Sequence, residues 1–502
     1  MVLRVTLDPR TPVIIGVGQY LHRADSLDDA LEPVALMEEA VRLAATDAGL
    51  DGPPPADSVR VVSVIGWRYR NAPRFLADRL GYDTSPDGVE LGESSNGGNS
   101  PQALVNRTAL DIASGNVDVA VLAGGEAFRS FMRARREGVK LDWPKADDDD
   151  LPVRIGTELD MNLAAERERG IVMPIQMYPM FETALRAASG RSVEEHEQFL
   201  GRLWSGLSEV AARNPNAWIR DAKTPDEITT VGPDNRMVGH PYPKLMNSNS
   251  SVDMAASVIM CSVEAATRLG VPESKWVFPQ SGTDCHEHDF VSHRDTFART
   301  PAVELGGRRA LELAGTTIDE VEIIDLYSCF PAAVQLGAQS LGIDLEARQW
   351  SRTGGLSFCG GPWNNYPMHA IATIVHELRE QPDATALVWA NGGYATKHSF
   401  GVYATTPPDG GFAHESPQDE IDAMPRRELA VGADAAGEAD IEAYTVMFSR
   451  EGEPELAIAA CLLADGRRAW GTSSDPAVTA AMCDGEWVGI TVHLDAEGTL
   501  TT

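Results

Sequence analysis

Two short segments of the sequence place reactive side chains where acid–base chemistry could occur. Asp325–Phe330 (DLYSCF) ends a predicted strand and presents a phenol at Tyr327 and a thiol at Cys329. A phenol or thiol on such a turn can donate a hydrogen bond to a developing enolate oxygen or relay a proton. His398 follows the glycine pair Gly392-Gly393, and imidazole titrates near neutral pH. Tyr327, Cys329 and His398 are therefore candidate catalytic residues, with a structural histidine as the alternative for His398.

Other reactive residues have simpler explanations. Buried cysteines are usually inert, which is the simpler interpretation of Cys359. Ser100 precedes a proline at the start of a predicted helix, so helix capping explains it without a nucleophilic role. Cys285–His288 (CHEH) has metal-ligating side chains but no distant partner at zinc-site spacing. Four consecutive acids at Asp147–Asp150 are typical of a solvated loop. No metal site is predicted.

The N-terminal part of the chain alternates strand-like and helix-like segments. Pro12–Gly18 is apolar and β-branched, which is typical of a buried strand. A helix with a regular apolar stripe is predicted from about Pro33 to Gly49, and Ser58–Ile65 is again strand-like. Strands that alternate with helices indicate a parallel α/β sheet.

A helix followed by a strand and a glycine pair occurs twice in the sequence. In the first unit, a helix over about Gln102–Ser114 leads to the strand Val117–Ala123. In the second unit, Tyr366–Leu378 leads to the strand Ala386–Ala390. Each strand is predicted to stop at its glycine pair. The repetition suggests an internal duplication, with coincidence in an ordinary α/β chain as the alternative.

Two further regions depart from this alternation. Residues 131–244 are richer in charge, Met and Trp, and they predict a large excursion that carries helices. Residues 406–434 have the Pro, Gly and acidic composition of a linker. Beyond them, a hairpin signal at Asp465-Gly466 and three strand-like segments predict a small five-stranded β-barrel of the oligonucleotide-binding (OB-like) type, a fold name that implies no nucleic-acid ligand. The strand-like segments are Ile441–Phe448, Leu456–Leu463 and Trp487–Leu494.

Several motifs, in their order and spacing, resemble the thiolase superfamily. Within it, they resemble the sterol-carrier-protein-2 type, and the type-1 thiolase-like proteins with an additional C-terminal domain. The motifs are Ser95–Leu104 (SNGGNSPQAL), Val119–Glu126 (VAVLAGGE), Asp325–Phe330 (DLYSCF) and Thr353–Pro362 (TGGLSFCGGP). Asn214–Ile228 and Asn247–Ala256 resemble the loop domain of the same group. The resemblance covers about residues 12–403.

This resemblance implies an α/β thiolase fold with two stacked βαβαβαββ halves, an inserted loop domain and a coenzyme A site. The predicted N-terminal half covers residues 1–275 and includes the loop domain at about 131–245. The predicted C-terminal half covers residues 276–408, and the additional β domain covers 409–502.

The residues that perform thiolase chemistry are missing at the matching positions. A thiolase uses a cysteine nucleophile at a helix N-terminus, where the helix dipole favours the thiolate. Here that position falls on Gly98 or Asn99. The Gly-His-Pro motif is Gly360–Pro362 without histidine, and the late cysteine turn is Ala390–Gly393 without cysteine. Thiolysis through a cysteine is therefore predicted to be weak or absent.

Other residues keep roles that the resemblance implies. Cys329 matches the second cysteine of the sterol-carrier type, and Tyr327 replaces a residue that helps to form an oxyanion hole. Coenzyme A is the implied ligand, bound as a substrate or cofactor. Basic residues in the loop segments are candidates for its phosphates. The candidate coenzyme A-binding residues are Arg220, Lys244, Asn249 and Ser250.

Composition limits the partners. The 502-residue chain has a net charge of −32, which disfavours nucleic acid because phosphate binding needs a basic surface. A local basic pocket can still bind an anionic small ligand.

No apolar run reaches the ~18–20 residues of a membrane span, and the first residues lack the pattern of a secretory signal. A cytoplasmic protein is therefore expected. The six cysteines form no CxxC pair, which argues against a disulfide framework or a zinc ribbon.

Three functions fit these observations. The first is a protein that binds coenzyme A or acyl-CoA, homologous to acetyl-CoA acetyltransferases and so an acyltransferase by family. The second is retro-aldol cleavage of a C–C bond in an acyl-CoA, and the third is a non-catalytic acyl-CoA sensor or scaffold. Turnover of a β-hydroxyacyl-CoA would separate the second function from the other two. Thiolases pair through a central strand, but the added domain leaves both a homodimer and a monomer open.

Overall fold

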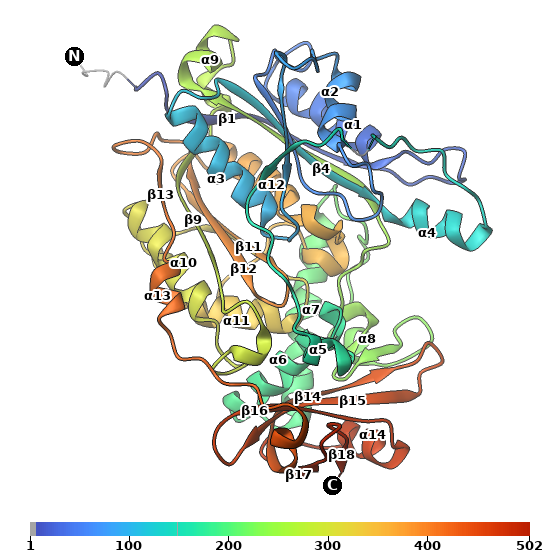
Figure 1. Cartoon of the computed structure of the whole chain (residues 1–502). Helices are drawn as coiled ribbons and strands as arrows, with labels where there is room; N and C mark the ends of the chain where they lie inside the picture. Colours follow the sequence, from blue (N-terminus) through green and yellow to red (C-terminus); the bar gives the residue numbers. More distant parts are fainter. Residues whose placement is uncertain (1–6, 148, 502) are drawn as a thin grey trace.

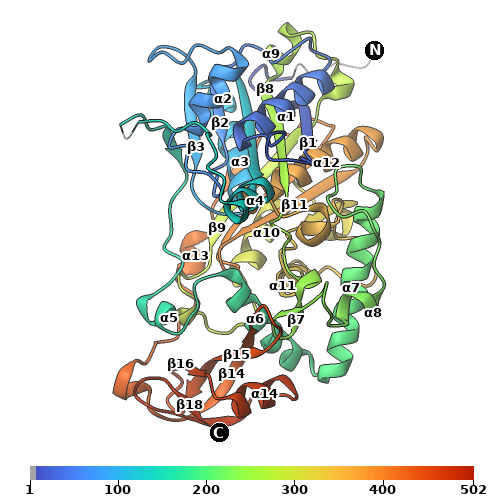
Figure 2. The same ribbon diagram turned by 90° about the vertical axis from the view of Figure 1, so that its right-hand side faces the viewer.

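Residues 7–147 and 149–501 are described by the computed structural model. Two mixed sheets form the core, with helices between them and on their outer faces (Figures 1 and 2). The C-terminal β domain, red in Figure 1, lies at the end of the molecule opposite the first sheet. None of the helices in the described ranges combines the length and apolar composition that crossing a bilayer requires.

The first sheet has the strand order β1-β8-β4-β2-β3-β5. β4, β2, β3 and β5 run parallel, whereas β8 is antiparallel to both β1 and β4. Every residue of β8 is buried, as expected for a strand that is covered on both faces. The strands are β1 (Pro12–Leu21), β2 (Ser58–Val61), β3 (Glu90–Ser94), β4 (Val119–Ala127), β5 (Val153–Ile155) and β8 (Asp253–Ser262).

The second sheet has the order β10-β11-β12-β9-β13. Its first four strands repeat the directions of β2-β4-β8-β1: one parallel pair followed by two antiparallel pairs. This shared topology supports the duplication suggested by the two helix–strand units. The strands are β9 (Phe278–His286), β10 (Ile323–Leu326), β11 (Thr385–Gly392), β12 (Lys397–Ala404) and β13 (Ala413–Glu415).

Helices α3 and α12 contact each other between the two sheets, while α1 packs on the first sheet and α10 on the second. α1 can approach β1 closely because a Cβ on Gly16 or Gly18 would come within 3.0 Å of α1 backbone atoms. The predicted helices at these places are therefore confirmed. The helices of the core are α1 (Pro33–Asp47), α2 (Ala72–Leu80), α3 (Ser100–Ala113), α9 (Val263–Arg268), α10 (Pro301–Leu313), α11 (Pro331–Leu341) and α12 (Tyr366–Glu380).

Two predicted strand ends are wrong. β4 continues through Gly124-Gly125 to Ala127, because glycine there lets Asn365 and Ala255 approach the backbone. β2 ends at Val61 rather than Ile65. The amide of Ile65 instead donates to the carboxylate of Glu126 at 2.6 Å, which pulls the chain out of the sheet.

The second half contains fewer strands than the predicted βαβαβαββ pattern. The first half has that full order of elements, but the described chain between α11 and α12 forms no strand. The backbone N–H of Leu326 instead bonds to the carbonyl oxygen of Trp350 at 2.9 Å. The segment then forms a π-helical turn at Gly355–Cys359. It therefore lies next to the candidate site instead of adding a strand to the sheet.

The excursion predicted between the halves is helical, as expected. Its longest helix is capped at Ser192, whose hydroxyl accepts the Glu195 N–H at 3.2 Å. Two short strands, β6 (Met237–Gly239) and β7 (Tyr242–Pro243), form a hairpin near its end. The helices are α4 (Phe128–Glu137), α5 (Ala164–Glu168), α6 (Pro174–Ser189), α7 (Val193–Arg213) and α8 (Pro225–Thr229).

The C-terminal β domain has the strand order β16-β15-β14-β17-β18, and β6 of the excursion also pairs with β14. The predicted closed barrel is not confirmed. In the described residues, the edge strands β16 and β18 are joined only by a bridge between Thr472 and Thr499. The hairpin predicted at Asp465-Gly466 joins β15 to β16. The elements are β14 (Gly437–Phe448), β15 (Pro454–Leu463), β16 (Arg468–Ser473), α14 (Pro476–Cys483), β17 (Thr491–Leu494) and β18 (Leu500–Thr501).

The C-terminal domain is attached to the core by buried polar contacts. The guanidinium of Arg468 pairs with Glu442 at 2.7 Å and donates to the carbonyls of Val291, Ser292 and Arg294 at 3.2, 2.8 and 2.7 Å. The indole N–H of Trp470 donates to the Ser292 hydroxyl at 2.9 Å. The predicted linker also has structure of its own, including β13 and α13 (Gln418–Asp422).

Candidate functional site

The turn before α3 contains Gly98 and Asn99, the two residues that the resemblance matches to the nucleophile position of a thiolase. A Cβ on Gly98 would come within 3.0 Å of the Tyr327 hydroxyl and of the Asn391 carbonyl oxygen. A Cβ on Gly97 would lie 2.9 Å from Nζ of Lys397. The space for a side chain at either glycine is therefore already filled by groups from the second sheet.

Tyr327 follows β10, as the sequence predicts, and its hydroxyl reaches this turn. Its ring packs edge-on against Tyr366 with a centroid separation of 5.6 Å. Burial, together with the nearby thiol of Cys329, raises the pKa of Tyr327 well above its usual value. The phenol is therefore protonated at neutral pH and is a hydrogen-bond donor rather than a base.

Cys329 is also buried on this turn, next to aromatic side chains. Burial raises the pKa of its thiol to about 12, although a hydrogen bond from Tyr178 opposes the shift. A protonated thiol is a poor nucleophile. The Tyr178 hydroxyl accepts from the Asn391 amide at 2.8 Å, and its ring stacks on Phe330 with a centroid separation of 4.6 Å. This thiol could relay a proton, but it lacks an activating base among these contacts.

The turn that lacks the family histidine contacts the predicted coenzyme A segment. The Gly361 N–H donates to the carbonyl of Asn249 at 2.9 Å, and a Cβ on Gly360 would lie 2.7 Å from the sulfur of Met254. The hydroxyl of Ser248 donates to the Cys329 carbonyl at 3.1 Å. The structure therefore places Asn249 and its neighbour Ser250 one and two residues after a contact with Cys329.

Cys359 packs beneath this turn with a carboxyl group beside it. Burial first, and then the charge of Asp325, raise the pKa of the Cys359 thiol above its usual range. Burial also raises the pKa of Asp325 to about 6. Asp325 accepts from the Arg352 N–H at 2.8 Å and from the Tyr366 hydroxyl at 3.1 Å, so its contacts orient the segment that leads to the π-helical turn. These contacts fit a structural role for both residues.

The segment with Arg220 docks on the same π-helical turn. The N–H groups of Trp218 and Ile219 donate to the carbonyls of Cys359 and Phe358, each at 2.8 Å. Arg220 itself is exposed, and so is Lys244, which begins a short 3₁₀ helix. Among the described residues, neither basic side chain has a carboxylate within the 4.0 Å of an ion pair.

Two arginines that the sequence did not single out join Trp218. The guanidinium of Arg23 lies over the indole ring at 4.3 Å from its centroid, and that of Arg129 lies at 5.8 Å. Arg23 also donates to the Trp218 carbonyl. Sequence analysis could not identify this basic cluster, because Arg23 and Arg129 are far from Trp218 in the sequence. The fold brings Arg23, Arg129 and Arg220 to one segment.

His398 and Ser100 are placed differently from the candidate site. On β12, Ser399 points toward α3, where Asn99 donates to its hydroxyl at 3.4 Å. The imidazole of His398 therefore points to the opposite face, where it accepts from Trp389 at 3.3 Å. Burial, with Arg294 nearby, lowers the pKa of His398 to about 3. The Ser100 hydroxyl donates to the Ser95 carbonyl at 2.7 Å, and Ser100 is the first helical residue rather than the predicted N-cap.

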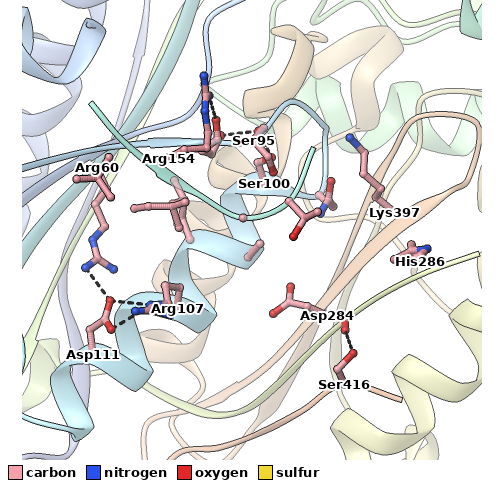
Figure 3. Close-up of a pocket in the computed structure, with 18 of the residues that line it drawn as sticks. Arg60, Ser95, Ser100, Arg107, Asp111, Arg154, Asp284, His286, Lys397 and Ser416 are labelled. Atoms are coloured by element: carbon pink, nitrogen blue, oxygen red, sulfur yellow. Dashed lines mark hydrogen bonds and ion pairs between the residues drawn. The ribbon is translucent and has the colours of Figure 1, made fainter. Parts of the chain in front are cut away.

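A cavity beside α3 lies away from the candidate coenzyme A-binding residues (Figure 3). Its volume is about 670 Å³. Polar residues from both sheets line it, and neither Tyr327, Cys329 nor the four candidate coenzyme A-binding residues are among them. Its lining residues with acidic, basic or imidazole side chains are Arg60, Glu90, Arg107, Asp111, Arg154, Asp284, His286, Lys397 and the candidate catalytic residue His398.

A carboxylate–imidazole pair lies at the edge of this cavity. Asp284 accepts from His414 Nε2 at 2.7 Å, from the Ser399 hydroxyl at 2.5 Å and from the Asn106 amide at 3.1 Å. His414 belongs to β13, inside the region with linker composition. No sequence signal marked it, because its partner is 130 residues away.

The segment Cys285–His288 contains metal-ligating types of side chain, but its residues do not come together as a metal site. Successive residues of β9 point to opposite faces, the Glu287 carboxylate accepts the Ala302 N–H at 3.0 Å, and His288 faces the Pro425 carbonyl. Within residues 7–147 and 149–501, no cluster of three or more His, Cys, Asp or Glu side chains is arranged to hold a metal ion. Asp147–Asp150 includes a residue outside the described ranges.

Comparison with known proteins relates both parts of the chain to one group. Residues 417–499 match the family model of the thiolase-like protein type 1 additional C-terminal domain. The crystal structure of a monomeric SCP2-thiolase like protein type 1 from Mycobacterium smegmatis is 32% identical, with a TM-score of 0.82 and 98% of each chain covered.

More distant relatives share part of the chain or the fold alone. An acetyl-CoA acetyltransferase from Syntrophomonas wolfei subsp. wolfei is 28% identical over 154 residues, 30% of this chain, and the match spans only 36% of that enzyme. The structure of the Ltp2-ChsH2(DUF35) aldolase is 19% identical, with a TM-score of 0.59, and covers 79% of this chain and 98% of its own. At that identity, the likeness extends to the fold only.

Proposed function

Because this chain belongs to the SCP2-thiolase-like proteins of type 1, we propose that it binds coenzyme A or an acyl-CoA and performs little or no thiolysis. The observation that carries this proposal is the docking of the segment with Trp218 and Arg220 against the π-helical turn Gly355–Cys359. A Cβ on Gly355 of that turn would lie 2.7 Å from the Ser328 hydroxyl, so the basic surface cluster adjoins, through this turn, the residues that include Tyr327 and Cys329.

The phosphates of the ligand would meet the basic cluster. Arg23, Arg129 and Arg220 lie on or beside the Trp218 segment, and Lys244 adds a further exposed ammonium. Guanidinium groups bind phosphate through paired charge-assisted hydrogen bonds. In a chain with a net charge of −32, such a local basic cluster supports binding of an anionic ligand.

The thioester end would lie toward Tyr327. A neutral phenol can donate a hydrogen bond to a thioester oxygen or to its enolate. The carbonyl of Asn249 accepts the Gly361 N–H at 2.9 Å, and Ser250 is the next residue along the chain. The Trp218 and Ile219 amides already bond to the carbonyls of Cys359 and Phe358. A pantetheine arm that bound between these segments would have to break some of these hydrogen bonds.

The residues around Gly98 are the reason why weak thiolysis is expected. A nucleophile there would collide with Tyr327, the Cys329 thiol stays protonated near neutral pH, and Gly360-Gly361 supplies no imidazole. Loss of one such catalytic group commonly lowers kcat by several orders of magnitude. Thiolysis of acetoacetyl-CoA is therefore expected near background, and a rate within ~100-fold of typical enzyme kcat values would contradict the assignment.

Calorimetry with coenzyme A and acetyl-CoA tests the binding proposal. The double variant Arg23→Met/Arg220→Met should weaken binding at least about tenfold, since each guanidinium–phosphate contact contributes more than an ordinary hydrogen bond. Arg450→Met is the matched control, because Arg450 is exposed on the C-terminal domain. No binding of either ligand at millimolar concentration, or equal affinity in both variants, would refute the proposal. At a ligand concentration of ~100 Kd, binding should also stabilise the fold by about 2.7 kcal/mol.

A second candidate function is aldol-type cleavage of an acyl-CoA. The position of the Tyr327 hydroxyl at the former nucleophile turn favours it, because that reaction needs an enolate donor rather than a thiolate. Turnover of a β-hydroxyacyl-CoA would support it. Acyl-CoA binding without any turnover would instead favour a sensor or scaffold.

A further inference from the structure

Lys397 differs from the other lysines of this chain. Of the six lysines, Lys140, Lys145, Lys223, Lys244, Lys275 and Lys397, only Lys397 is buried, with 6% of its surface exposed. Its ammonium donates to the carbonyl of Asn96, and no carboxylate within the described ranges lies close enough to form an ion pair with it. Buried cations normally have such a partner. Arg60 and Arg468, which are equally inaccessible, pair with Asp111 and Glu442 at 2.7 Å.

The amine lines the 670 Å³ cavity together with other titratable groups (Figure 3). Lys397 is paired directly across the strands with His286. Asp284 lies two residues before His286 and so faces the same side of the sheet. Beside it, His414 Nε2 donates to the carboxylate of Asp284 at 2.7 Å. An amine, an imidazole and a carboxylate therefore face one space that is large enough for a small organic molecule.

The charges around Lys397 favour a neutral ligand. Glu158 accepts the Asn96 N–H at 3.0 Å, next to the carbonyl that Lys397 contacts, and Asp284 faces the cavity from the other side. The arginines that line the same cavity are already paired, Arg60 and Arg107 with Asp111 and Arg154 with Glu158. The carboxylates near Lys397 would therefore repel an anion there. Burial lowers the pKa of Lys397, while the charge of Glu158 opposes the shift. A lower pKa increases the fraction of neutral, nucleophilic amine at a given pH.

We propose that Lys397 forms an imine with an uncharged aldehyde or ketone that binds in this cavity. The neutral amine attacks the carbonyl carbon, a C–N bond forms, and the carbonyl electron pair moves to the oxygen, which takes up a proton. The first nitrogen proton goes to that oxygen and gives a carbinolamine. Its hydroxyl then leaves as water with a second proton, which the nitrogen's remaining proton replaces. The sum is ketone plus amine giving imine plus water, so no oxidant or reductant is needed.

The remaining groups have roles in proton transfer and positioning. Asp284 holds the His414 imidazole and the Ser399 hydroxyl, which offers a route for protons between the cavity and solvent. Gly97 leaves room for the lysine, because a Cβ there would lie 2.9 Å from Nζ. The proposal does not depend on coenzyme A binding, since the basic cluster at Trp218 consists of other residues.

Reductive trapping tests the proposal on the full chain. The protein is mixed with limiting propanal and sodium cyanoborohydride near pH 7, digested, and analysed by mass spectrometry at all six lysines. We expect at least about tenfold more reduced adduct at Lys397 than at the exposed Lys140 and Lys244, because imine formation needs a neutral amine. Asp284→Asn should slow labelling at Lys397 and leave labelling at Lys244 unchanged.

The experiment distinguishes an imine-forming Lys397 from a structural lysine. Lys397→Arg keeps the charge and should remove the preferred adduct, with circular dichroism confirming that the variant folds. If Lys397 labels no faster than Lys140 and Lys244, or only after unfolding in urea, then it is a structural lysine and the proposal is wrong. The wild-type measurement decides this even if Lys397→Arg fails to fold. A positive result with no coenzyme A binding would overturn the proposed function and leave this inference intact.

Discussion

Replacing Gly98 by alanine tests whether groups from the second sheet fill the former nucleophile position. The new Cβ would come within 3.0 Å of the Tyr327 hydroxyl and of the Asn391 carbonyl, whereas real Cβ atoms keep a greater distance. Overpacking of this kind costs about 1–3 kcal/mol. The Asn391 carbonyl belongs to β11 and cannot move without disturbing its ladder with β12, so we expect Gly98→Ala to fall in the upper part of that range.

The contribution of the phenol can be separated with a second substitution. Tyr327→Phe removes the nearest of the three atoms that would lie within 3.0 Å of the new Cβ, and its ring stays packed on Tyr366. The double variant Gly98→Ala/Tyr327→Phe should therefore recover about 1 kcal/mol of the loss, which is a coupling within the usual 0.5–3 kcal/mol range for residues in contact. The remaining loss would reflect the Asn391 carbonyl and the ring carbon Cζ of residue 327.

Urea unfolding followed by tryptophan fluorescence measures these changes, provided that the slope m stays constant among variants. Gly206→Ala is the matched control, because Gly206 lies in α7 with no atom within 4 Å of a new Cβ. This control should stabilise the chain by up to about 1 kcal/mol. If Gly98→Ala is neutral, or if the double variant is simply additive, the position is open and the reasoning about lost thiolysis fails.

Three further predictions concern other parts of the fold. Arg468→Met should lower the free energy of unfolding by about 3–5 kcal/mol in urea titrations, because it leaves a buried carboxylate unpaired, whereas exposed Arg450→Met should change little. Burial raises the pKa of Glu126 to about 8 from its ordinary 4.5, so the folded state holds a proton that the unfolded state releases. Stability should therefore fall as pH rises from about 4.5 to about 8, and Glu126→Gln should flatten that pH profile. Any measured acyl-CoA cleavage should drop in Tyr327→Phe and Cys329→Ala, and unchanged rates in both would exclude them as catalytic residues.

The elements that were predictable from the sequence are those with strong local signals. The apolar run of β1 and the proline-started helices α1, α3 and α12 all form where expected. The repeated helix–strand units correspond to equivalent positions in the two sheets. Local patterns succeed here because a strand that is buried on both faces of its sheet has a continuous apolar stretch, and proline marks the first turn of a helix.

Local patterns failed where contacts over long sequence separations decide the structure. The glycine pair after Ala123 marks close packing against Asn365 rather than a strand end. His398 looks like a site residue in sequence, but the two-residue period of β12 turns it away from Lys397. The pairing of Asp284 with His414 depends on a short strand within a stretch that has linker composition. None of these contacts and orientations can be recognised from a short stretch of the sequence.

The strands that end the two sheets also help to build the 670 Å³ cavity. β5 pairs with β3 and ends the first sheet, and β13 pairs with β9 and ends the second. The residues of β5 and those just after β13 are walls of the cavity. A partner subunit that paired with β3 or β9 instead would have to displace one of these strands, because their backbone groups already occupy that position. The walls of the cavity beside Lys397 therefore depend on the strands that cover β3 and β9 at these edges.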